Sequence, residues 1–174
     1  MNMKIYIACS LTHVPRDEFT TYVSFIHDLA AHLAKELSAE VKYALQDSDP
    51  QLALKPFHER ARLCYVWDRQ MVEWANVVVA EASHPSTGLG IELQIAETKD
   101  TPIVITFRAT EQNRAPPAQY KNPDSSIHNL QLGDGYVSLM ALGLPSVFRV
   151  IPYVDSSCAH RDIATALHEI DQPN

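Results

Sequence analysis

Residues 76–93 read NVVVAEASHPSTGLGIEL, and this stretch decides the fold. Its first part, from Asn76 to Ala80, is a β-branched run that is too apolar for a half-exposed strand and is typical of a central strand in a parallel sheet. A polar turn follows, and a helix is predicted from Gly88 to Thr98. A buried strand that leads through a short turn into a helix is the repeating unit of α/β folds.

The same alternation extends to both sides of this unit. Strands are predicted over residues 4–9, 41–45, 102–107 and 146–153, and helices over 17–37, 58–74, 136–142 and 162–170. Because crossovers between such strands are right-handed, they give one parallel sheet with helices on both faces. Ligands of such sheets bind beyond the carboxyl ends of the strands.

Two segments interrupt the alternation, and neither indicates a second domain. Residues 46–56 are polar and are predicted to form a loop. Residues 108–135 contain three prolines and little that could enter a core, which predicts a long surface loop. Loops of that length are more often functional or partner contacts than idle. We therefore expect a single domain over residues 1–174 with a long loop at 108–135.

Composition and charge narrow the classes of function. The chain has 174 residues, 46% of them hydrophobic and 20% charged, which is typical of one globular domain. A net charge of −7 argues against a nucleic-acid polymer or an anionic membrane as partner. No apolar stretch approaches the ~18 residues of a membrane span, so we expect a cytoplasmic protein. Cys9, Cys64 and Cys158 are widely spaced, and they predict neither a disulfide framework nor a metal site.

Glycine is scarce, and its positions are informative. The chain has five glycines, and Gly88 and Gly90 stand one residue apart at the start of a predicted helix. This spacing suggests a special backbone path or a close approach to a ligand. Free amides at the helix start, with the hydroxyls of Ser86 and Thr87, would suit an anion. A third glycine is missing, so a dinucleotide cofactor is not predicted, and an ordinary strand-to-helix turn remains the alternative.

Two carboxylates could carry chemistry near this turn. Glu92 lies in the first turns of the predicted helix, where the helix dipole favours the anion that a nucleophile needs. Asp68 lies among apolar residues of the preceding helix, a setting that favours the neutral form of a proton donor. Two such carboxylates are the usual equipment for breaking a glycosidic bond. The alternatives are a solvated helix face for Asp68 and a simple helix-start charge for Glu92.

Two segments carry a family resemblance. Residues 68–81, DRQMVEWANVVVAE, and residues 84–93, HPSTGLGIEL, closely resemble the nucleoside 2-deoxyribosyltransferase superfamily. Within it the sequence is most similar to the 2′-deoxynucleoside 5′-monophosphate N-glycosidases. The resemblance spans nearly the whole chain. It implies a flavodoxin-like (Rossmann-like) three-layer sandwich with a five-stranded parallel sheet and no cofactor or metal.

The resemblance also implies roles for individual residues. Glu92 would be the nucleophile, Asp68 the second catalytic carboxylate and Tyr6 their catalytic partner. Residues at the 5′ end of the substrate would be Ser10, Leu11, Thr12, Ser86, Gly88 and Gly90. Residues 137–140, VSLM, are similar to a motif that one subunit lends to its neighbour's phosphate site, which makes Ser138 a candidate across a homodimer interface.

The implied reaction is hydrolysis of the N-glycosidic bond of a (deoxy)nucleoside 5′-monophosphate through a glycosyl-glutamate intermediate. Two departures leave alternatives open. Thr12 stands where the family has an arginine, with His13 or Arg16 as replacements, and the 108–135 loop is longer than in the monophosphate hydrolases. Base exchange on unphosphorylated deoxynucleosides is therefore one alternative. A non-catalytic nucleotide-binding module is another.

Overall fold

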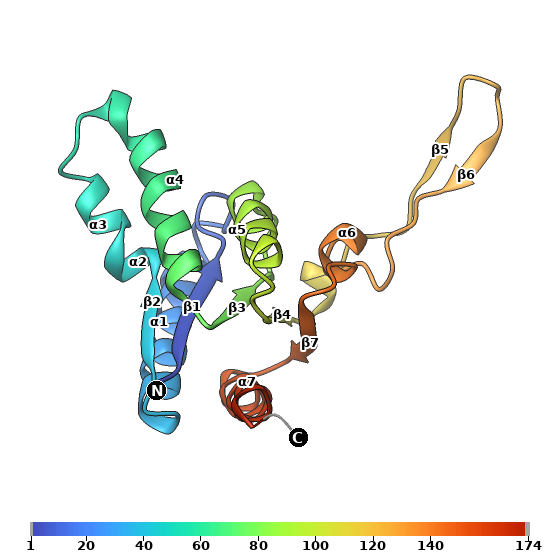
Figure 1. Ribbon diagram of the computed structural model, residues 1–174. Coiled ribbons are helices and arrows are strands. Elements are labelled where there is room, and N and C mark those ends of the chain that lie inside the picture. Colours follow the sequence, from blue (N-terminus) through green and yellow to red (C-terminus); the bar gives the residue numbers. More distant parts are fainter. Residues whose placement is uncertain (1, 173–174) are drawn as a thin grey trace.

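The computed structural model describes residues 2–172 and is built on a five-stranded parallel sheet. The strand order is β2-β1-β3-β4-β7 (Figure 1). The strands are β1 (Lys4–Cys9), β2 (Glu40–Tyr43), β3 (Val77–Glu81), β4 (Ile103–Arg108) and β7 (Val147–Tyr153). With helices on both faces, this is the predicted flavodoxin-like α/β fold. The β-branched run is the central strand, as predicted, and all five residues of β3 are buried.

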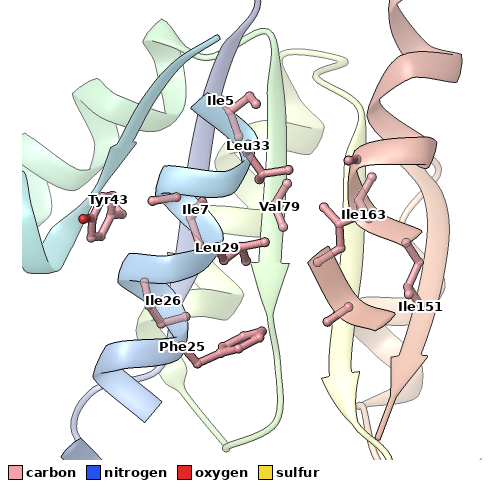
Figure 2. Packing of buried hydrophobic residues seen from close by; sticks show 14 of the residues in the cluster. Ile5, Ile7, Phe25, Ile26, Leu29, Leu33, Tyr43, Val79, Ile151 and Ile163 are labelled. Carbon is pink, nitrogen blue, oxygen red and sulfur yellow. The ribbon is translucent and has the colours of Figure 1, made fainter. Parts of the chain in front are cut away.

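One face of the sheet packs against helices α1 (Phe19–Glu36) and α7 (Ser156–Asp171). Alternate strand residues such as Ile7 and Val79 point toward this layer, where they meet Leu29 of α1 (Figure 2). Burial of these side chains removes apolar surface from water, which is the main favourable contribution to folding.

The other face packs against helices α4 (Phe57–Trp74) and α5 (Thr87–Thr98). Tyr6 and Ala8 of β1 point toward this layer because successive strand residues face opposite ways. Met71 and Val72 of α4 and Leu93 of α5 close the cluster. Any side chain on the inward side of α4 or α5 therefore shares a layer with Tyr6.

Three elements differ from the sequence expectation. Residues 46–56 are not simply a loop, because two one-turn helices, α2 (Ala44–Asp47) and α3 (Asp49–Leu52), occupy most of that segment. Helix α7 begins at Ser156 instead of residue 162, because the Asp155 side chain caps it by accepting a hydrogen bond from the Cys158 amide at 2.9 Å. Helix α6 (Leu139–Leu142) covers only the second half of the predicted 136–142 helix.

The 108–135 segment is exposed, as predicted, but it is partly regular. It contains a short 3-10 turn, η1 (Glu111–Asn113), and an antiparallel hairpin of β5 (Gln119–Lys121) and β6 (Ile127–Asn129). The turn between these strands is closed by the Asp124 carboxylate, which accepts a hydrogen bond from the Ser126 amide at 3.0 Å. The hairpin projects away from the sheet (Figure 1).

Cys9, Cys64 and Cys158 are free thiols of intermediate exposure. Within residues 2–172, no helix has the length and apolar character needed to cross a membrane.

Candidate active site

The loops that follow β1 and β3 meet at one edge of the sheet, as the sequence predicted. The two strands pair in parallel, with Cys9 opposite Glu81. Directly beyond them, the Ser10 hydroxyl donates a hydrogen bond to the His84 carbonyl oxygen at 2.6 Å. Ser10 is fully buried, and its amide donates to the Tyr22 hydroxyl at 3.2 Å. Both hydrogen-bond donors of Ser10 are therefore used within the protein. The expected role of Ser10 was instead that of a donor to a 5′ group.

Tyr6 and Glu92 form the centre of the site. The Tyr6 hydroxyl donates to Glu92 Oε1 at 2.6 Å, and the two side chains come from β1 and α5. Glu92 is on the inward side of α5 because it lies three residues after Leu89 and four before Ala96, which are both buried. Tyr6 is 1% exposed and Glu92 9% exposed. A carboxylate so enclosed is costly unless it is hydrogen-bonded or neutralised.

The electrostatic setting of Glu92 differs from the sequence expectation. Glu92 is the sixth residue of α5, beyond the first turn in which the helix dipole acts. Burial raises the pKa of Glu92 to about 8, with the Asp68 charge adding to the rise and the Tyr6 hydrogen bond opposing it. The prediction of a helix-stabilised anion was wrong, because desolvation outweighs the dipole at this position. Glu92 is held partly protonated at neutral pH.

Asp68 lies on α4, on the same side of the sheet as Tyr6. It is half-buried, and both of its oxygens accept hydrogen bonds. The Ser48 hydroxyl donates to Oδ1 at 2.6 Å and the Cys64 thiol donates to Oδ2 at 3.2 Å. Asp68 is close enough to Tyr6 and Glu92 for its charge to raise the pKa of both groups. The structure thus brings the three residues named as catalytic into one centre.

Ser48 and Cys64 were not identified from the sequence. Cys64 precedes Asp68 by four residues on one helix, and that spacing puts their side chains together. This contact could therefore have been predicted from the sequence. Ser48 comes from the turn between α2 and α3 and is 2% exposed. Its segment was expected to be a polar loop, and only the folded chain places it against Asp68.

The start of α5 has the features of an anion site. These features come from its N-cap and its free amides, and not from its glycines. Ser86 is the N-cap, and its hydroxyl oxygen accepts the Leu89 amide at 3.1 Å. The amides of Thr87 and Gly88 are in the first turn, where a helix offers no acceptor. These donors point out of the helix end, which is the usual arrangement for binding an anion.

The expectation of a special backbone path at Gly88 and Gly90 was wrong. Both lie inside α5, and positive φ angles among the described glycines occur at Gly133 and Gly135. A Cβ at Gly88 would make an ordinary 3.6 Å contact with the Ser86 hydroxyl oxygen, and a Cβ at Gly90 would meet nothing within 4 Å. The protein itself therefore does not require glycine here, and space is left beside the helix.

A pocket of about 880 Å³ adjoins this helix start. Ser86, Thr87 and Gly90 line it from α5, and Ser138 and Met140 line it from the other side. Its volume is within the range of small-molecule sites. Tyr6, Asp68 and Glu92 are not part of its lining, so the predicted site consists of a buried catalytic centre and a separate pocket that meet at α5.

The remaining predicted contacts lie on the loop after β1. Leu11 is half-buried and packs against the core, and Thr12 is exposed. The Arg16 guanidinium donates to the Thr12 carbonyl oxygen at 3.3 Å. Arg16, one of the two proposed replacements for the missing arginine, therefore uses its guanidinium for a hydrogen bond within its own loop. Within residues 2–172, His13 is exposed and no contact places it in the site.

Comparison with known proteins gives a fold likeness. No protein-family model matches the chain, and no curated protein matches it in sequence. A conserved protein from Enterococcus faecalis V583 is 15% identical with a TM-score of 0.60, covering 98% of this chain and 99% of its own. The CMP N-glycosidase of Clostridium botulinum is 14% identical with a TM-score of 0.53, covering 92% and 98%.

A third solved structure is similar over a comparable length. The 2-deoxyribosyltransferase of Bacillus psychrosaccharolyticus is 16% identical with a TM-score of 0.56, covering 93% of this chain and 94% of its own. At these identities the likeness establishes the fold over nearly the full length of each chain.

Proposed function

We propose that this protein hydrolyses the N-glycosidic bond of a (deoxy)nucleoside 5′-monophosphate through a covalent intermediate on Glu92. The observation that carries the proposal is the buried hydrogen bond from the Tyr6 hydroxyl to Glu92 Oε1, with Asp68 in the same centre. Two proteins that share the fold, a CMP N-glycosidase and a 2-deoxyribosyltransferase, support this class of substrate.

In the first step, ionised Glu92 attacks the anomeric carbon while the bond from that carbon to the base nitrogen breaks. The Tyr6 hydrogen bond holds one carboxylate oxygen, which leaves the other to form the new bond. The electron pair of the broken bond goes to the base. Because the transition state resembles an oxocarbenium ion, a nearby carboxylate stabilises it.

Asp68 supplies or relays the proton that the departing base takes up. Ser48 and Cys64 fix the orientation of its carboxyl group through their hydrogen bonds to both oxygens. In the second step water attacks the anomeric carbon, Glu92 leaves, and Asp68 accepts the proton from water. Burial raises the pKa of the Cys64 thiol to about 12, so Cys64 is an orienting donor and not a nucleophile.

The 5′ group binds at the start of α5. The Ser86 hydroxyl and the amides of Thr87 and Gly88 supply donors there. Thr12 and Arg16 belong to the loop after β1, where the Arg16 guanidinium donates to the Thr12 carbonyl oxygen. Ser10 contributes by holding this loop to His84.

Base exchange is the second candidate, and the absence of an arginine at position 12 favours it. A transferase would pass the sugar from Glu92 to a second base instead of to water. Supplying dCMP or deoxycytidine together with excess adenine separates the two reactions. We expect free cytosine and no new adenine nucleoside or nucleotide, whereas an adenine product would identify the transferase.

We also propose a homodimer in which Ser138 serves the neighbouring site. Ser138 is exposed beside Met140, which is 84% exposed, and Ile91 on the opposite side of the 880 Å³ pocket is 46% exposed. Mixing E92A, which lacks the nucleophile, with S138A, which lacks the 5′-group donor, tests this. If Ser138 acts across the interface, hybrid dimers regain one intact site. No regained activity in hybrids of proven composition would place Ser138 with its own chain.

The direct test of the reaction is base release by wild type and E92A. We expect E92A to release no measurable base from deoxynucleoside monophosphates. Mass spectrometry of quenched wild-type reactions should locate a glycosyl adduct on the peptide containing Glu92. An adduct on the Asp68 peptide would reverse the roles of the two carboxylates. Nucleotide binding by calorimetry without any base release would indicate a non-catalytic binding module.

A further inference from the structure

Glu81 is a buried carboxylate that the proposed reaction does not use. It is the last residue of β3, is 0% exposed, and points to the face opposite Tyr6, in phase with Val77 and Val79. Burial raises its pKa, and the hydroxyls of Ser83, Tyr22 and Tyr153 oppose the rise. A carboxyl group inside an apolar layer costs several kcal/mol unless its partners compensate.

The partners of Glu81 converge on one of its oxygens. Oε1 accepts the Tyr153 hydroxyl at 3.0 Å, the Ser83 amide at 3.3 Å and the Ser83 hydroxyl. Oε2 is buried and has no hydrogen-bond partner among the described residues. The carboxyl group thus acts as a fixed acceptor for the first residues of the loop after β3.

Ser83 extends this attachment to the neighbouring segments. Its hydroxyl oxygen accepts the Arg108 amide at 2.7 Å, at the end of β4. Its carbonyl oxygen accepts the Asn113 side-chain amide at 2.9 Å, in the η1 turn. The next residue, His84, accepts the Ser10 hydroxyl through its carbonyl oxygen. Every polar atom of Ser83 is therefore hydrogen-bonded.

We propose that Glu81 is a positioning residue that holds the loop of residues 82–86, and with it the 5′-group donors of Ser86 and the α5 start. Four residues of chain separate Glu81 from Ser86, so a loop released at Ser83 can shift the N-cap. This inference rests on the proposed function, because it assigns Glu81 to the binding of the 5′ group. The carboxyl oxygen is the acceptor that matters, and its negative charge is not required.

The test compares E81L and E81Q with T106V. Thr106 is also 0% exposed and donates its hydroxyl to the Ile151 carbonyl oxygen, so T106V removes a buried side-chain hydrogen bond on the adjacent strand. The backbone hydrogen bond from the Ala82 amide to the Thr106 carbonyl oxygen stays in place. We expect E81L to raise KM for a deoxynucleoside monophosphate about tenfold with little change in kcat, and to lower the preference for the phosphorylated substrate by the same factor. E81Q should stay within about threefold of wild type, because its amide oxygen replaces Oε1.

A second readout does not depend on activity. Hydrogen exchange of the Ser83, Leu89 and Arg108 amides, which are hydrogen-bonded through this loop, should be at least tenfold faster in E81L than in wild type, and unchanged in T106V. Should E81L fail to fold, S83A breaks the same attachment from a half-buried position and replaces it in both measurements. The inference is overturned if loop exchange and substrate preference in E81L or S83A match T106V, or if E81Q is as impaired as E81L.

Failure of the proposed function has a different signature. If the wild-type protein releases no base from any deoxynucleoside monophosphate, the proposed reaction is wrong. The exchange rates of the same variants still decide whether Glu81 holds the loop.

Discussion

The two faces of the sheet each contain a buried glutamate that accepts a hydrogen bond from a tyrosine hydroxyl, and they differ in the number of donors that reach one carboxylate oxygen and in exposure. Glu92 receives the Tyr6 hydroxyl and keeps 9% of its surface exposed. Glu81 receives three donors on Oε1 and is fully buried. Three donors on one oxygen fix the backbone around Glu81. A carboxylate with one donor and some access keeps the capacity to react.

The difference predicts opposite responses to the same substitution. We expect E92Q to lower the rate of base release by more than about 10³-fold, because an amide is a poor nucleophile toward the anomeric carbon. E81Q should change this rate by less than about threefold. Initial rates with a deoxynucleoside monophosphate measure both. Comparable losses in the two variants would remove the distinction between a reactive and a holding glutamate.

The Tyr6 hydrogen bond should set the pH dependence of the reaction. With a pKa of about 8, Glu92 becomes ionised, and so active, as pH rises toward 8. Y6F removes the bond that lowers this pKa, so the rising limb of kcat/KM should move to higher pH and the rate at pH 7 should fall about tenfold. Y65F, on the exposed side of α4, is the matched control. If the rising limb of kcat/KM does not move in Y6F, the group that titrates is not Glu92.

The raised pKa of Glu92 should also be visible in stability. The folded protein holds a proton on Glu92 between pH 4.5 and about 8 that the unfolded chain releases. The contribution of this group is therefore fully present below pH 4.5 and is lost as pH rises through 8. E92Q cannot titrate, so its melting temperature should exceed that of wild type increasingly from pH 6 to pH 9. Thermal scans check this, with E59Q at an exposed position as control.

The smallest effect should come from the second tyrosine. Y153F removes one of three donors to Glu81 Oε1 and should lower the free energy of unfolding by about 1 kcal/mol. Base release should be nearly unchanged, because two donors from Ser83 remain. Urea denaturation and initial rates measure the two quantities, and Y120F on the exposed hairpin is the control. A large loss of activity in Y153F would show that the α1 and α7 face takes part in catalysis directly.

Much of the architecture could be predicted because it depends on local periodicity. The apolar run of β3 and the spacing of apolar residues in α1 and α4 each identify their element without reference to the rest of the chain. The missed elements are short or exposed: α2, α3 and the β5-β6 hairpin bury little apolar surface, so they leave little periodic signal. The start of α7 depends on one cap, Asp155, which the predicted helix of residues 162–170 did not include.

The candidate site was predicted in part. Tyr6, Asp68 and Glu92 were named from motifs, and the sheet and its two covering helices bring them together. The prediction that the helix dipole stabilises ionised Glu92 was wrong, because the desolvation of Glu92 outweighs the dipole and depends on packing around α5. Ser48 and the partners of Glu81 were missed because they come from segments far apart in the chain.

The sequence by itself determined which residues form strands and helices and which face each of them presents, because side-chain alternation is a local property of the backbone. It also supplied the carboxylates and hydroxyls. Only the tertiary structure decided how each carboxylate is buried and hydrogen-bonded. Burial and the number of donors depend on neighbours from other elements. Those neighbours give Glu92 one tyrosine and a raised pKa, and they give Glu81 three donors and a loop to hold.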